Sequence, residues 1–290
     1  MHLFRTDLAV ESAAPFRDRL PDGVSCSERE QEGIRVTAVE ITSQQAAKQL
    51  GKPVGRYVTV GMPPIGGPVN PADEVTHLLA EELRRMLPPE GMVLVVGLGN
   101  AQITPDALGP LTVRQILATR HIPAQLAEQT GLSGLRPVAA IAPGVLGQTG
   151  IETGEIILSI VRDLSPAAVV AVDALAAGSP ERLGCTIQLS DSGISPGSGV
   201  LNARKELSRQ SLGVPVLSLG IPTVVDGGTL VCGLFGCEDE SRVPEEARAM
   251  MVTPRDVDAL IERGAKHLSL ALNAALQPQL SLEEISYLVS

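Results

Sequence analysis

The chain has 290 residues, of which 23 are basic, 33 are acidic and 44% are hydrophobic, and its formal net charge is −10. This composition supports a substantial core, whereas the missing Lys/Arg runs and the scarcity of aromatic residues argue against direct binding of nucleic acid. No apolar stretch resembles a signal-peptide core or a membrane span. We therefore expect a cytoplasmic protein that stays off membranes and keeps its four cysteines reduced.

The N-terminal third predicts two strands and a helix. The first 33 residues are polar and charged, so the fold is expected to begin at Ile34–Ile41, where apolar and polar residues alternate. Arg56–Val60 is a second strand candidate. Asn70 and Pro71 have the types typical of a helix N-cap and first helical residue, and an apolar face follows them.

A buried strand and an acid-bearing loop come next. Val93–Val96 is a run of aliphatic residues, typical of a strand covered on both faces. The loop Gly97–Asn100 begins like a dinucleotide fingerprint, although the third glycine would fall at Gln102, so a nucleotide or small-molecule binding module remains an alternative. Asp106 follows this loop and is expected outside the strand's carboxyl end, where open α/β sheets bind ligands.

A second acid is predicted at the same edge of the sheet. Val138–Ile141 is a short strand before a glycine-rich loop that contains Glu152, and Thr153 can cap the following helix. Ala167–Val172 is again fully apolar and is expected to present Asp173 at its carboxyl end. Asp106 and Asp173 are thus both expected at the carboxyl edge of the sheet.

The C-terminal half continues the alternation of strands and helices. Strands are predicted at Cys185–Leu189 and Val214–Leu219, a helix at Asn202–Leu212, and an acid-bearing turn at Ile221–Gly228. The segment 229–252 has the mixed charge of an insertion.

Two helices close the chain, a long amphipathic one from Pro254 to Leu276 and a short one near Leu282–Leu288. The whole pattern predicts an α/β protein with one domain, a three-layer α/β/α fold around a mixed, mostly parallel sheet.

Several hydrolase classes lack residues that their chemistry needs. Gly193–Gly197 matches the serine nucleophile elbow, but Pro196 follows the serine and has no N–H for an oxyanion hole. The histidines lie outside any triad context, and Cys232 with Cys237 has no second pair at zinc-ligand spacing. Asp191 starts only one aspartic-protease triplet where two are needed, so it is interpreted as a loop or substrate-contact residue.

Paired carboxylates are the chemistry that remains. Two acids that share a site cannot both ionise cheaply, so Asp106 and Asp173 could act as general base and general acid on a water molecule. Two unrelated loop acids are the alternative interpretation of these residues alone.

Several motifs together, in order, resemble one family, the germination (spore) protease of endospore-forming bacteria. They are R-T-D-L-A-V-E from Arg5, T-P-D-A-L-G-P from Thr104, A-P-G-V-L-G-Q-T-G-I-E-T from Ala142, V-D-A-L-A-A from Val172, S-D-S-G-I-S-P-G-S-G from Ser190 and G-I-P-T-V-V-D from Gly220. The similarity extends to the helix ending near Leu276 and so covers nearly the whole chain.

The resemblance implies an atypical aspartic endopeptidase that degrades small acid-soluble spore proteins during germination, in the spore core, as a homotetramer without a cofactor or metal. It implies a fold similar to that of hydrogenase-maturation endopeptidases, with Asp106 and Asp173 as the catalytic pair. A metal-dependent peptidase of the maturation type is the rival, although no histidine follows either acid.

Four further residues in the matching blocks are expected in the site loops or in contact with substrate: Asn100, Thr104, Glu152 and Asp191.

The N-terminus resembles the family's substrates, which are cut after Thr-Glu and before Phe or Ile, then Ala-Ser-Glu. Thr6 to Glu11 has the similar order Thr, acid, large apolar, Ala, any residue, Glu. We therefore expect self-processing between Asp7 and Leu8, with residues 1–7 as a short, mobile propeptide-like segment ahead of a domain at 8–290. Only four residues precede Arg5, fewer than the propeptide that the resemblance implies.

Overall fold

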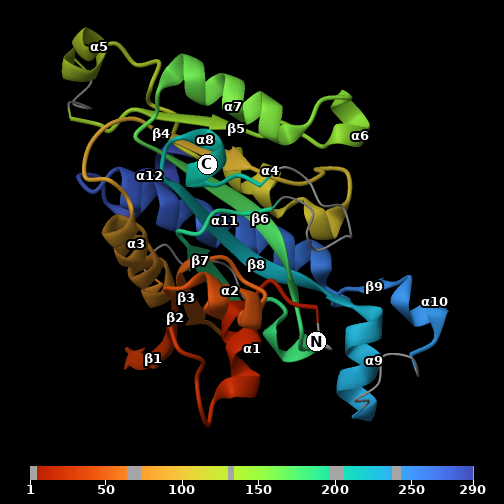
Figure 1. Cartoon of the computed structure of the whole chain (residues 1–290). Coiled ribbons are helices and arrows are strands. Elements are labelled where there is room, and N and C mark those ends of the chain that lie inside the picture. The colour runs from red at the N-terminus through yellow and green to blue at the C-terminus, as the bar shows by residue number, and fades with distance from the viewer. Residues whose placement is uncertain (1–4, 64–72, 130–133, 196–205, 237–242, 290) are drawn as a thin grey trace.

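The computed structural model describes the chain except for residues 1–4, 64–72, 130–133, 196–205, 237–242 and 290. Within the described residues, nine strands form one mixed sheet in the order β1-β2-β3-β7-β8-β6-β4-β5, with β9 paired to β8 (Figure 1). The strands are β1 Val24–Gln31, β2 Ile34–Ile41, β3 Gly55–Gly61, β4 Val93–Gly97, β5 Val138–Ile141, β6 Ala168–Ala177, β7 Thr186–Ser190, β8 Val216–Asp226 and β9 Met251–Val252.

The sheet has a parallel half and an antiparallel half. β5, β4, β6 and β8 are parallel neighbours, whereas β1, β2, β3 and β7 are joined by antiparallel pairings. Because of these pairings β1 and β3 run in the direction of the parallel strands, and only β2, β7 and β9 oppose it. All five residues of β4 are buried, as its aliphatic run predicts.

Helices cover both faces of the sheet (Figure 1). On one face α3, α4, α11 and α12 form the main core with the sheet, and on the other face α1, α2, α7 and α8 cover two smaller clusters. The predicted three-layer α/β fold with a mixed sheet is confirmed. The helices are α1 Ala9–Ala13, α2 Gln44–Leu50, α3 Glu74–Met86, α4 Leu108–Val113, α5 Ala124–Gln129, α6 Leu146–Thr149, α7 Thr153–Leu164, α8 Arg209–Leu212, α9 Gly227–Phe235, α10 Glu245–Arg248, α11 Val257–Leu276 and α12 Leu282–Leu288, with short 3-10 turns η1 Ala14–Phe16, η2 Thr104–Asp106 and η3 Pro180–Arg182. No helix in the described part of the chain is long and apolar enough to span a membrane.

The fold begins earlier than the sequence suggests. The expectation of a start at Ile34 is wrong, because β1 already pairs along the full length of β2, and Leu8 and Ala9 are completely buried. β1 is an edge strand with mostly exposed side chains, so its polar sequence is that of a solvated edge and carries no apolar signal. The described residues before β1 are no free arm, since Leu8 to Ala13 pack into the core.

Helix starts differ from the sequence in two places. Asp73 is the N-cap of α3 and accepts a hydrogen bond from the Val75 N–H, while the predicted cap Asn70 lies outside the described residues. Glu152 occupies the N-cap position of α7, and the Thr153 hydroxyl instead donates to the Gly144 carbonyl.

The predicted helix at 202–212 is observed only as α8, and residues 196–205 lie outside the described part. The two C-terminal helices agree with the prediction, although α11 starts at Val257. The segment 229–252 contains most of α9, then α10 and β9, at the end of β8.

Two strands are longer than expected. β6 continues through Asp173 to Ala177, so Asp173 lies within the strand and not at its carboxyl end. The turn predicted at Ile221–Gly228 is mostly strand as well, because β8 runs to Asp226. The two extensions pair with each other, which satisfies the backbone groups on their shared side although Ala, Gly and Pro are poor strand formers.

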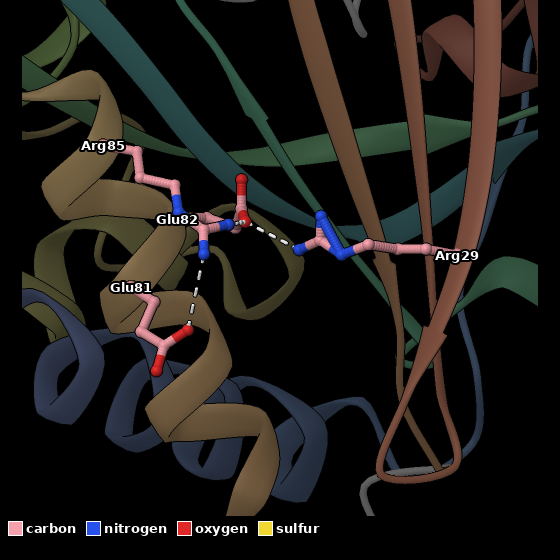
Figure 2. Close-up of polar contacts among 4 residues, drawn as sticks. All are labelled: Arg29, Glu81, Glu82 and Arg85. Atoms are coloured by element: carbon pink, nitrogen blue, oxygen red, sulfur yellow. Dashed lines mark hydrogen bonds and ion pairs between the residues drawn. The ribbon is translucent and has the colours of Figure 1, made fainter.

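A buried acid joins the edge strand to a helix. Glu82 on α3 is 2% exposed, and its Oε1 accepts from the Arg29 guanidinium of β1 at 2.7 Å. Figure 2 shows Glu82 between Arg29 and Arg85, which lies on the same helix and contacts both Glu82 and Glu81. Because a buried carboxylate needs partners, this cluster fixes the outermost strand against the helical layer.

We predict that Arg29→Ala lowers the free energy of unfolding by about 1–3 kcal/mol, since it takes a charged partner from a buried carboxylate. Arg35→Ala is the matched control, because Arg35 pairs with Glu28 while both side chains are exposed, at 74% and 58%. Such a surface pair contributes about 0–1 kcal/mol. Urea denaturation measures both losses, and equal losses would contradict the assigned role of Glu82.

Candidate functional site

A cavity of about 630 Å³ opens at the sheet edge where β4 ends. Its wall comes from the N-terminal segment, the loop after β4, the end of β6, β7 and its following loop, and β8. Four acids, Asp7, Asp106, Asp173 and Glu206, line it. The cavity therefore brings together the two acids predicted to pair and the acid at the expected processing site.

The turn after β4 connects Asp106 with Asp173. The Leu98 N–H donates to the Val172 carbonyl at 2.8 Å, one residue before Asp173. The Asn100 N–H donates to Oδ2 of Asp106 at 2.7 Å. One short turn thus contacts the backbone beside one acid and the carboxylate of the other.

Glycines make this turn possible. Gly99 has a φ of +108°, and a Cβ there would lie 2.1 Å from the Asp106 carbonyl oxygen. A Cβ at Gly109 would lie 2.3 Å and 2.4 Å from the carbonyl oxygens of Leu98 and Val172. The loop therefore sits directly on the backbone of η2, and α4 sits on the backbone of the loop and of β6, where side chains have no room.

Each acid has further fixed contacts. Asp173 is almost completely buried, and its Oδ1 accepts from the Ala174 N–H at 2.9 Å. The turn that carries Asp106 is anchored to β8, because the Thr223 hydroxyl donates to the Pro105 carbonyl at 2.8 Å. These bonds hold both carboxylates at the cavity wall.

The N-terminal segment lies along β6 and under a glutamine. The Asp7 N–H donates to the Ala176 carbonyl, and the Ala176 N–H donates to Oδ2 of Asp7, both at 2.8 Å. Gln188 on β7 donates from Nε2 to the Asp7 carbonyl at 3.0 Å and accepts at Oε1 from the Ala9 N–H at 2.8 Å. The bond between Asp7 and Leu8 is therefore held at the cavity from both sides.

Lys52 and Glu11 make further contacts that hold the N-terminal segment in place. Lys52 donates from Nζ to the Thr6 carbonyl at 2.7 Å. Burial lowers the pKa of the Lys52 ammonium, while the carboxylates of Asp7 and Glu11 act in the opposite direction. Oε2 of Glu11 accepts from the Gly178 N–H at 2.7 Å and from the Thr6 hydroxyl.

The four other predicted site residues do not all line the cavity. Asn100 lines the cavity, whereas Thr104, Glu152 and Asp191 are absent from its described wall. Asp191 accepts from the Arg56 N–H at 2.7 Å and so fixes the loop whose next residue, Ser192, does line the cavity.

Sequence reasoning missed Lys52, Tyr57 and Gln188, which also line the cavity. Burial raises the pKa of the Tyr57 phenol to about 12, so it stays neutral near neutral pH. Gln188 alone had a signal, since it is a polar residue inside a fully buried strand.

Metal-ligand geometry is not found in the described part of the chain, where no three side chains among His, Cys, Asp and Glu are placed to hold one ion. Cys232 is buried, and Cys237, its suggested partner, lies outside the described residues.

Comparison with known proteins decides the family. The family model described as Germination protease matches residues 6–234, which include all four cavity acids and Gln188. The chain belongs to the germination protease family. Curated germination proteases are similar over nearly the whole length of both chains. That of Clostridium perfringens strain ATCC 13124 is 42% identical, covering 99% of each chain, and that of Caldanaerobacter subterraneus subsp. tengcongensis is 39% identical, covering 98% of each.

A germination protease is a peptidase that acts on a protein substrate, and the resemblance seen in the sequence motifs is thereby confirmed. Among solved structures, a NiFe hydrogenase maturation protease from Thermococcus kodakarensis KOD1 is 15% identical, with a TM-score of 0.35, covering 66% of this chain and 98% of that one.

We predict that Gly99→Ala lowers peptidase activity by about 100-fold, because the added methyl displaces the Asp106 backbone from the cavity wall. Gly213→Ala is the matched control: Gly213 also has a positive φ, +77°, but no heavy atom lies within 4 Å of its added Cβ. It should lose some stability and keep its activity. Similar kcat values for the two folded variants would show that the turn does not position Asp106.

Proposed function

We propose that the protein is an endopeptidase that initiates the degradation of small acid-soluble spore proteins in the spore core during germination, using Asp106 and Asp173. The observation that carries this proposal is that both acids line one cavity in which a segment of the chain, around Asp7, is already bound. Family membership makes the protein a peptidase, and this cavity is the place where a peptide and two carboxylates meet.

The chemistry follows from two carboxylates in one site. One carboxylate is ionised and takes a proton from a water molecule, and the oxygen of that water attacks the carbonyl carbon of the peptide bond. The other is protonated and donates its proton, which reaches the nitrogen that leaves as the C–N bond breaks. Burial of Asp173 and the backbone N–H that each carboxylate accepts restrict the pair to fixed positions, which favours concerted proton transfer.

The same site is proposed to process the chain itself between Asp7 and Leu8, so that residues 1–7 are removed from a peptidase domain at 8–290. Asp7 lines the cavity with both acids, and its carbonyl is held by Gln188. In this proposal the uncut chain is a zymogen.

Assembly as a homotetramer is part of the proposal. Exposed apolar side chains supply contact surfaces for it, with Leu234 and Phe235 at the end of α9 and Tyr287 on α12 the most exposed among them.

Asp106→Asn and Asp173→Asn should each abolish peptide cleavage while leaving the melting temperature near the wild-type value, since the amide keeps the shape and removes the titrating group. The double variant should be little worse than either single one, because the two residues act as a unit. Asp73→Asn serves as the control, because asparagine caps α3 as well as aspartate does and Asp73 is not among the residues that line the cavity. Full activity of either single variant would end the paired-aspartate proposal.

Self-processing is tested by N-terminal sequencing after incubation at mildly acidic pH. A new terminus at Leu8 is expected in the wild type and not in Asp106→Asn. An unchanged Met1 terminus in enzyme that still cuts its substrate would rule the processing out.

A further inference from the structure

One edge of β6 is open beyond the end of β4. β4 pairs with β6 only as far as Gly97 opposite Val172, while on its other side β6 pairs with β8 up to Ala177. A strand residue points its N–H and C=O to the same side, and alternate residues share that side. The backbone groups of Ala174 and Ala176 therefore face the place that a longer β4 would fill.

The N-terminal segment lies against this open edge of β6, just ahead of α1. The Asp7 N–H donates to the Ala176 carbonyl, and the Ala176 N–H donates to the Asp7 carboxylate. The Gly178 N–H, two residues further along the same side, donates to the Glu11 carboxylate. Addition of an extended peptide to an open sheet edge is a general mode of peptide recognition, in which main-chain bonds give affinity and side-chain pockets give specificity.

Most of these contacts use atoms that any peptide offers. Gln188 binds a carbonyl and an amide two residues apart, on the two sides of the Asp7–Leu8 bond, and Lys52 binds a third main-chain group, the Thr6 carbonyl. Gln188 is only 6% exposed, so its carboxamide is held in place without the flexibility of a surface side chain.

Side-chain selection comes from two kinds of contact. Leu8 is fully buried in an apolar cluster whose other members are Val10, Leu175, Ala177 and Val225. The carboxylates of Asp7 and Glu11, by contrast, accept hydrogen bonds from the backbone N–H groups of Ala176 and Gly178 at the β6 edge. The site thus suits an acidic residue, then a large apolar one, and a second acid further along.

We propose that Gln188 and the β6 edge at Ala176 and Gly178 are the substrate-binding site of the enzyme, with Gln188 as the residue that positions the peptide across the bond to be cut. This rests on the proposed function for the identity of that bond. The chain's own segment occupies the site, so a peptide supplied from outside must displace it.

The test uses the Asp106→Asn protein and a fluorescein-labelled peptide with the sequence of residues 3–14. Leu8→Arg is added to release the segment, because an arginine cannot be buried in the apolar cluster. We expect anisotropy to show at least about tenfold tighter peptide binding after this change, since the competing segment has left.

Gln188→Leu, added to that protein, should weaken binding of the peptide by at least about tenfold, as two hydrogen bonds are lost. Gln188→Glu, which keeps the shape but cannot donate to the carbonyl, should weaken it as well. The matched control is Gln277→Leu, because Gln277 is also buried and also binds a backbone N–H and carbonyl, those of Arg136, away from the cavity. Melting temperatures from circular dichroism verify that each variant folds.

Peptide binding that is the same in the Gln188 and Gln277 variants overturns the proposal, and so does an absence of binding after release of the segment. Cleavage is followed in parallel with Asp106 intact. Binding that depends on Gln188 in a chain that never cuts the peptide supports the site and refutes the proposed function, whereas cleavage with the same KM in both variants refutes the site alone.

Discussion

Two parallel neighbours of unequal length determine the arrangement of this molecule. β4 stops at Gly97, while β6 continues for five more residues to Ala177 with only β8 beside it. Backbone N–H and C=O groups away from water need partners, so the step between the two strands has to be filled. The loop after β4 fills its beginning and the N-terminal segment fills the rest, which is why residues far apart in the sequence meet in one cavity.

Close backbone contact makes this step rigid. Gly97, Gly99 and Gly109 each lie where a Cβ would collide with backbone atoms of the opposing segment. A loop that packs at this distance has little freedom to shift, so Asp106 keeps its position relative to β6 without long side chains to brace it. The rigidity of the acid-bearing loop thus comes from residues without side chains.

Local sequence patterns predicted much of this architecture. Aliphatic runs identified β4 and the start of β6, and helical periodicity identified α7 and α11, because each of these elements buries a face of its own. Strand direction placed Asp106 and Asp173 on the same side of the molecule, and both line one cavity, although Asp173 lies within β6 and not at its end. β1 was not predicted because an edge strand needs no apolar pattern. The end of β6 was not predicted because pairing with its neighbour β8, and not its own sequence pattern, stabilises it.

The parts of the site that the sequence did not reveal depend on long-range contacts. Gln188 meets Asp7 across 181 positions, and Lys52 meets Thr6 across 46. No spacing rule connects such residues, since the sheet order that brings β7 beside the N-terminal segment is a property of the whole fold. Motif recognition found Asp7 and Leu8 but not the groups that bind them.

The complete burial of Leu8 has a consequence for the proposed cut. Hydrolysis after Asp7 would turn a neutral amide into an ammonium group on Leu8 and a new carboxylate on Asp7, at a place where the Leu8 side chain has no exposed surface. Retaining an ion in such surroundings costs several kcal/mol, whereas water solvates it readily. The chemical step would therefore convert a tightly docked segment into one that is driven out by its own charges, and reversal would require both ions to be dehydrated again. Processing of this kind would therefore be irreversible in practice.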